Sequence, residues 1–131
     1  MPRSSKTLPA VRLEAVSTER EAAFLSAVRR SVQLHRPWVT PPSTTKAFRA
    51  YVAKLNGKTH VGYFVCSRDG DLVGVVNLNE IVRGRFRSAY LGYYAFVPHN
   101  GKGWLTAGLA AAISAAFRSL RLHRLEANIQ P

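Results

Sequence analysis

The segment 95–109, AFVPHNGKGWLTAGL, holds the residues best suited to bind a ligand. An apolar stretch leads into a turn with glycines at 101 and 103, and an amphipathic stretch follows directly. A turn that opens into a helix presents unpaired backbone N–H groups at the positive end of the helix dipole, which favours phosphate. Glycine also lets a ligand approach the backbone closely. The segment therefore predicts a phosphate site, although an ordinary connection between a strand and a helix can share this pattern.

The composition indicates one globular domain over residues 1–131. Hydrophobic residues make up 47% of the chain, which is ample for a packed core. No segment approaches the roughly 20 apolar residues that span a membrane, and the N-terminus lacks the apolar region of a secretory signal. The one cysteine, Cys66, excludes an internal disulfide and a cysteine-based zinc site. We expect a buried strand thiol there and a cytoplasmic protein.

The chain is strongly basic, with 19 Lys+Arg against 7 Asp+Glu and a net charge of +12. A solvated basic surface explains this charge, and so does an acidic partner such as a phosphorylated cofactor, RNA or an acidic protein. Arg83, Arg85 and Arg87 alternate along the chain, so an extended segment places them on one face. That face is either a solvated hairpin tip or a docking patch for an acidic partner such as RNA. The four histidines show no metal-binding spacing, so no metal is expected.

Hydrophobic periodicity predicts an α/β (α+β) domain in the order β-α-α-β-β-β-α-β. We expect a mixed, mostly antiparallel sheet with helices on both faces. The C-terminal helix carries an apolar stripe that includes Leu105, Leu109, Phe117 and Leu120. A proline-rich loop is expected over 35–42. The expected strands are 11–16, 61–67, 72–81, 88–97 and 122–129; the expected helices are 19–33, one from a cap at 43 or 44 to about 56, and 105–120.

Three stretches carry a resemblance to a known family: GVVNLNEIVRGRFRSAYLGYY, HNGKGWLTAGLAAAI and LHRLEANIQP. They resemble the GCN5-related N-acetyltransferase superfamily, and in particular its ribosomal-protein-alanine acetyltransferase branch. The resemblance implies the acyl-CoA N-acyltransferase fold. It also implies transfer of an acetyl group from acetyl-CoA to the N-terminal amine of a protein, such as a ribosomal protein. The alternatives are an acyl-CoA-binding module without turnover and a ribosome- or RNA-associated module on the same fold.

The resemblance also implies where acetyl-CoA binds. The family's loop pattern [QR]-x-x-G-x-[GA] falls on residues 98–103, with Pro98 in place of the customary Gln or Arg. Backbone N–H groups from Asn100 to Trp104 are expected to hold the pyrophosphate, with Lys102 adding charge. Phe96 and Val97 are expected to pair with the pantetheine arm. The implied cofactor residues are Phe96, Val97, Asn100, Gly101, Lys102, Gly103 and Trp104.

Amine acetylation needs a group that takes a proton from the acceptor ammonium. Four of the seven acidic residues are expected in helix or hairpin turns, which leaves Glu14, Glu80 and Glu126 on strands. Glu80 leads nearest to the predicted cofactor loop and is the candidate base. The alternative is an exposed strand-end carboxylate paired with an arginine. His35 and Trp38, in the proline-rich loop, are candidates for the acceptor-site wall.

The family's pattern continues beyond the residue that corresponds to Pro131, where a further helix and two strands follow. The resemblance therefore implies a C-terminally incomplete fold with one open cofactor wall. An uncovered sheet edge favours association. We expect self-association, most simply as a homodimer.

Overall fold

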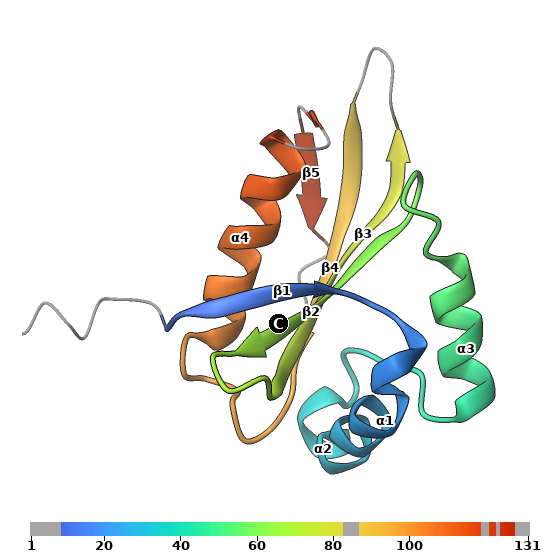
Figure 1. Ribbon diagram of the computed structural model, residues 1–131, viewed down its shortest axis with the longest axis vertical. Coiled ribbons are helices and arrows are strands. Elements are labelled where there is room, and N and C mark those ends of the chain that lie inside the picture. The colour runs from blue at the N-terminus through green and yellow to red at the C-terminus, as the bar shows by residue number, and fades with distance from the viewer. Residues whose placement is uncertain (1–8, 83–86, 119–120, 123, 128–131) are drawn as a thin grey trace, which may run out of the picture.

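The computed structural model describes residues 9–82, 87–118, 121–122 and 124–127. Its centre is a five-stranded sheet in the order β1-β2-β3-β4-β5 (Figure 1). The first four strands are antiparallel to their neighbours, and β5 is parallel to β4. The strands are β1 (Val11–Ala15), β2 (Val61–Ser67), β3 (Leu72–Val82), β4 (Ser88–Ala95) and β5 (Arg124–Ala127). The mixed, mostly antiparallel sheet predicted from the sequence is confirmed.

The helices lie on both faces of this sheet, as expected. Helix α4 packs against one face, and the helices between β1 and β2 lie on the other side (Figure 1). Thr44 caps one of them, because its side chain accepts a hydrogen bond from the backbone N–H of Ala47. The helices are η2 (Thr18–Arg20), α1 (Glu21–Arg30), α2 (Val32–His35), α3 (Thr45–Lys54) and α4 (Trp104–Arg118).

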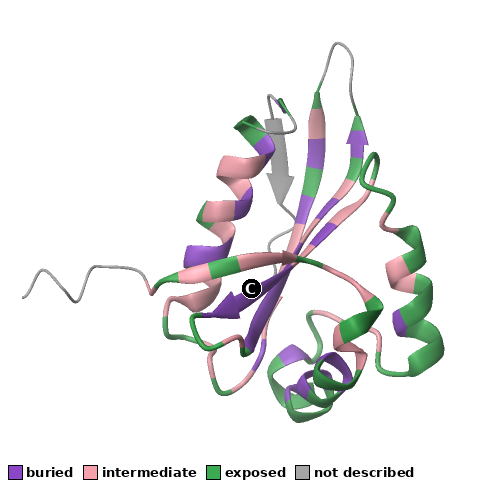
Figure 2. Cartoon of the chain, viewed as in Figure 1, coloured by how far each residue is buried: buried purple, intermediate pink, exposed green. Residues whose placement is uncertain are grey.

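Each face of the sheet has its own apolar core, and the buried positions in Figure 2 follow these two layers. One core joins the sheet to α1 and α3 and contains four phenylalanines with no exposed surface: Phe24, Phe48, Phe64 and Phe96. The other core lies between the sheet and α4. Cys66 is fully buried on β2, and burial raises the pKa of its thiol, so the expected buried strand thiol is confirmed.

Two local expectations were wrong. The helix predicted over 19–33 is interrupted at Ser31, which separates α1 from α2. The apolar stripe predicted for α4 includes Ala112 and Ala116, which are buried as expected, but Phe117 of the same stripe is 45% exposed. Leu120, the last residue of the predicted stripe, lies outside the described residues.

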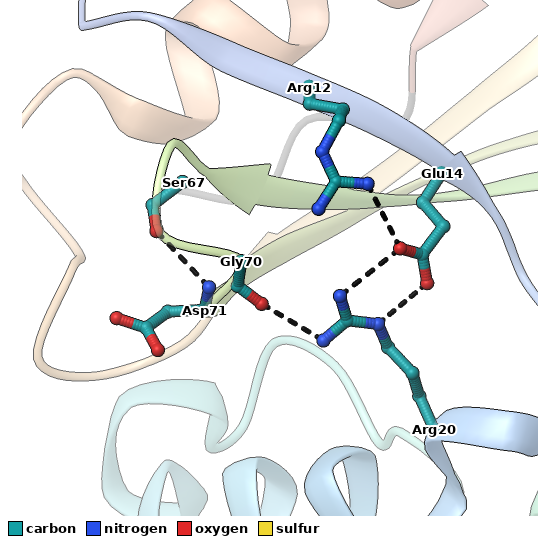
Figure 3. A network of polar contacts seen from close by, with 6 residues as sticks. All are labelled: Arg12, Glu14, Arg20, Ser67, Gly70 and Asp71. Atoms are coloured by element: carbon teal, nitrogen blue, oxygen red, sulfur yellow. Dashed lines mark hydrogen bonds and ion pairs between the residues drawn. The ribbon is translucent and has the colours of Figure 1, made fainter.

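A polar network joins β1 to the turn between β2 and β3 (Figure 3). The Arg20 guanidinium donates to both carboxylate oxygens of Glu14, with the shorter contact at 2.6 Å, and to the backbone oxygen of Gly70 at 2.9 Å. Arg12 adds a further contact to Glu14 at 3.2 Å. The Arg20 hydrogen bonds hold the pKa of Glu14 below its usual range. Glu14 is therefore a structural carboxylate, although sequence reasoning left it among the candidate bases.

Within the described part of the chain, no helix is long and apolar enough to cross a membrane. The predicted arginine face lies mostly outside the described residues. Arg83 and Arg85 lie outside the described residues, whereas Arg87 is described and exposed.

Candidate functional site

A cleft of about 520 Å³ opens beside the C-terminal half of β4. Strand β5 pairs with β4 only from Ser88 to Leu91, so the rest of β4 has no partner strand on that side among the described residues. The cleft brings together four residues singled out from the sequence: His35, Trp38, Glu80 and Asn100. They come from three separate regions of the chain.

The open edge of β4 presents backbone groups to this cleft. The Phe96 N–H donates to the Val73 oxygen at 3.0 Å, which fixes the alternation of the antiparallel ladder with β3. Residues 93 and 95 therefore direct their N–H and C=O groups away from β3, and both line the cleft. An extended ligand with amide groups can pair with a strand edge of this kind.

Phe96 and Val97, which the sequence predicts to contact the ligand, make backbone hydrogen bonds within the protein. Phe96 is fully buried in the core, and its backbone oxygen accepts a bond from the His99 N–H at 3.0 Å. The Val97 N–H donates to the Ser31 hydroxyl at 3.1 Å, and its oxygen accepts from Arg30 at 2.7 Å. The backbone groups of both residues are already used within the protein. The groups that face the cleft lie earlier on β4.

The junction of α1 and α2 holds the end of β4 in place. Arg30 and Ser31 bind Val97, and His35 Nε2 lies 2.7 Å from the Ala95 oxygen. Ser31 has no exposed surface and stands where the helix is interrupted. The Ser31 hydroxyl and the His35 imidazole therefore both bind the backbone of the short segment from Ala95 to Val97. Sequence reasoning missed Arg30 and Ser31, because neither belongs to a motif.

His35 is held tightly in the wall of the cleft. Its side chain lies among aromatic rings, 5.3 Å from Tyr94 and 5.9 Å from Phe96 between ring centroids. A carbonyl oxygen can only accept, so Nε2 carries the proton in its bond to Ala95. The residue is 5% exposed, and its Nδ1 has no partner within the described structure. His35 thus fixes the cleft wall rather than projecting into solvent.

Glu80 reaches the cleft because β3 contains a bulge. Asn79 pairs with Tyr90 and Val82 pairs with Ser88, so two residues of β3 oppose one residue of β4. Glu80 has a φ of 51°, which is unusual for a residue other than glycine. Its neighbour Ile81 is buried in the core beneath α4, while Glu80 is exposed. The bulge lets Ile81 fill the core and leaves the carboxylate of Glu80 at the cleft.

The turn between β4 and α4 contains two glycines in the left-handed region of backbone conformation. Gly101 and Gly103 have φ values of 74° and 84°, a region that favours glycine. A Cβ at Gly101 would meet no other atom within 4 Å, so the backbone there is open to a ligand. Lys102 is exposed beside it, and α4 begins at Trp104. The N–H groups of the first turn of a 15-residue helix therefore lie next to an exposed cation.

Apolar side chains form the outer wall of the cleft. Leu34, Trp38 and Tyr90 all line it and are 37%, 44% and 50% exposed. Glu80 is the single carboxylate among the described residues that line it. The cleft therefore combines an apolar wall with one negative charge. Among the described residues, no group of three metal-ligating side chains is present.

The model of the acetyltransferase (GNAT) domain family matches residues 11–131. This span includes the whole sheet, the glycine turn and every residue of the cleft named above.

Curated relatives are similar over part of the chain. Probable N-acetyltransferase YjcK of Bacillus subtilis (strain 168) is 42% identical over 72 residues, which cover 55% of this chain and 39% of YjcK. The [ribosomal protein uS5]-alanine N-acetyltransferase of Escherichia coli (strain K12) is 39% identical over 61 residues, which cover 47% of this chain and 31% of that protein. The matched segments thus span well under half of these relatives.

Solved structures share the fold. RimJ of Mycobacterium smegmatis in complex with CoA-disulfide has a TM-score of 0.83 at 24% identity, covering 94% of this chain and 64% of that one. Spermidine N-acetyltransferase from Vibrio cholerae, in complex with CoA and spermine, has a TM-score of 0.73 at 20% identity. The match covers 88% of this chain and 68% of that one. The acyl-CoA N-acyltransferase fold expected from the sequence is confirmed.

Proposed function

This chain belongs to the acetyltransferase (GNAT) domain family, and on that premise we propose that it transfers an acetyl group from acetyl-CoA to the N-terminal amine of a protein or peptide. One observation carries the proposal: a single cleft joins the open edge of β4 to the glycine turn at one end and to Glu80 at the other. A thioester and an amine can meet in such a cleft.

Acetyl-CoA would supply the activated acetyl group, and this chain's residues fit its parts. The turn 100–103 and the first N–H groups of α4 face the phosphates, with Lys102 as the nearby cation. The backbone of Tyr93 and the Ala95 N–H, rather than Phe96 and Val97, would pair with the amides of the pantetheine arm. The Ala95 oxygen stays bound to His35.

Glu80 would act as the base for the acceptor. The ammonium must lose a proton before its nitrogen can form the new C–N bond as the C–S bond breaks. A carboxylate at the rim of the cleft can take that proton directly or through water. The positive φ of Glu80 supports this role, because unusual backbone conformations of this kind gather at functional sites.

The charge of the cleft favours an acceptor with one positive charge. One structural neighbour, a spermidine N-acetyltransferase, was solved in complex with spermine. One relative is instead named for a protein acceptor, ribosomal protein uS5. A polyamine carries several ammonium groups and needs several carboxylates. Here Glu80 is the one carboxylate that the described cleft offers, on a chain of net charge +12. An N-terminal amine next to a small apolar side chain matches Glu80 and Trp38 better.

The test is an intact-mass assay with acetyl-CoA and peptides that begin with Ala or Ser, alongside spermidine. We expect a gain of one acetyl group on the peptide N-terminus and a slower reaction with spermidine. Acetylation of spermidine alone would contradict the acceptor class. Binding of coenzyme A without any turnover would favour the binding module, and no binding of coenzyme A would refute the proposed cofactor.

The basic charge supports a second candidate, a ribosome- or RNA-associated role. We expect replacement of Arg83, Arg85 and Arg87 by Ser to weaken association with ribosomes and flatten its salt dependence. An unchanged salt slope would identify these arginines as a solvated surface.

Self-association stays a prediction, and light scattering over a concentration series checks it.

A further inference from the structure

A second chamber of about 270 Å³ adjoins the cleft beneath the proline-rich loop. It shares four lining residues with the main cleft: Val39, Gly92, Tyr93 and Tyr94. Its other walls are Thr40, Pro41, Pro42, Tyr51 and Asn77. No charged residue is among the described residues that line it, and none of the sequence motifs pointed to it.

A row of three residues across the sheet explains why the chamber is hollow. Gly62 on β2 pairs with Asn77 on β3, and Asn77 pairs with Gly92 on β4. The space above Gly62 is filled, because a Cβ there would lie 2.7 Å from the Tyr51 hydroxyl. The space above Gly92 has room for a Cβ, whose nearest neighbour would be Asn79 Nδ2 at an ordinary contact distance of 3.7 Å. Gly92 lines both the chamber and the cleft, so the two spaces meet at this residue.

Asn77 lines this space and carries an amide N–H group that can donate a hydrogen bond. The Tyr51 hydroxyl donates to Asn77 Oδ1 at 2.6 Å, which fixes the amide orientation and leaves the Nδ2 group as a donor. Burial raises the pKa of Tyr51, so its phenol keeps the proton that makes this bond. A fixed amide N–H in an uncharged chamber is suited to a carbonyl oxygen.

We propose that this side chamber is a subsite for the second residue of the acceptor peptide, with Asn77 Nδ2 donating to a peptide carbonyl. The inference rests on the proposed N-terminal acetylation and names the part of the acceptor that the site recognises. A peptide supplies a carbonyl and a small uncharged side chain next to its amine. A simple alkylamine has neither, and a polyamine would bring a second cation into a chamber that holds no carboxylate.

The test compares two amines on the coenzyme A-saturated protein: alanyl-alaninamide, which has peptide carbonyls, and isopropylamine, which has none. Calorimetry gives the affinity of each, and initial rates give each KM. We expect Asn77→Leu, which keeps the branching of the side chain but removes its polar groups, to weaken the dipeptide about tenfold and leave isopropylamine unchanged. Gly92→Leu, which fills the chamber entrance, should do the same.

Gly92→Ala is the matched control, since its Cβ fits at an ordinary contact distance and should leave both affinities near wild type. Circular dichroism checks that each variant folds, and Tyr51→Phe provides a variant that loosens Asn77 without adding bulk. Equal weakening of both amines by Asn77→Leu, or none, would overturn the subsite while leaving the proposed function standing. Failure of the wild-type protein to bind or acetylate either amine would refute both.

Discussion

The glycine turn and the cleft beside it are built in opposite ways. The turn and the start of α4 are consecutive in the chain, over residues 98–106, and their shape depends on local backbone conformation. The cleft is assembled from α2, the proline-rich loop, β3 and β4, together with Asn100 and Leu105, so its walls bring together residues up to about 70 positions apart in the chain. Changes in the turn should therefore affect cofactor affinity alone, whereas changes in the cleft should affect the acceptor, the rate or the stability of the whole domain.

Glu80→Gln should give the largest effect and separate the two regions most clearly. Loss of the carboxylate should lower the acetylation rate at neutral pH about 10²-fold or more, because no base then accepts the ammonium proton. Coenzyme A affinity, measured by calorimetry, should stay unchanged. A wild-type rate across the pH range would make Glu80 a structural residue of the bulge.

His35→Leu should show how much the His35 hydrogen bond stabilises the end of β4, which leads from the cleft to the glycine turn. The substitution leaves the Ala95 oxygen without its donor, and we expect a loss of about 2 kcal/mol in the free energy of unfolding. His35→Gln is the matched control, because its amide can still donate to that oxygen. Urea denaturation gives both values. Equal stability of the two variants would mean that the hydrogen bond does not hold β4.

Gly103→Glu should affect the turn without affecting the cleft. A negative charge beside the expected phosphates should weaken coenzyme A about tenfold, and added salt should reduce the difference. Gly103→Ala measures the cost of a side chain at a φ of 84° without the charge. If the two variants bind coenzyme A equally, the phosphates do not lie at this glycine.

Glu14→Gln should give the smallest effect, which is a small change in the free energy of unfolding. It should leave both coenzyme A affinity and the acetylation rate unchanged. The folded pKa of Glu14 lies below its ordinary value, so its ion pair stabilises the protein above the unfolded pKa. That contribution is lost as the pH falls through the folded pKa. We expect Glu14→Gln to cost up to about 1 kcal/mol at pH 7 and to approach the wild-type stability as the pH falls below the folded pKa of Glu14. A constant difference over this fall in pH would contradict the ion-pair origin.

The comparison also shows why some expectations failed. Helix 19–33 was predicted as continuous, because nothing local in its sequence breaks it. The interruption at Ser31 is stabilised by Val97, a residue 66 positions away. The same distant contact occupies the backbone that sequence reasoning had assigned to the cofactor.

The sequence by itself determined the elements whose causes are local. Alternation gave the strands, the 3.6-residue period gave α4, and the glycines at 101 and 103 gave the turn, because each depends on neighbouring residues. Only the tertiary structure decided which backbone groups of β4 remain open and that a bulge brings Glu80 to the cleft. It also placed Asn77 between two glycines, of which Gly62 has no room for a Cβ and Gly92 has room for one. Strand register and helix packing set these features, and they depend on contacts between residues far apart in the chain.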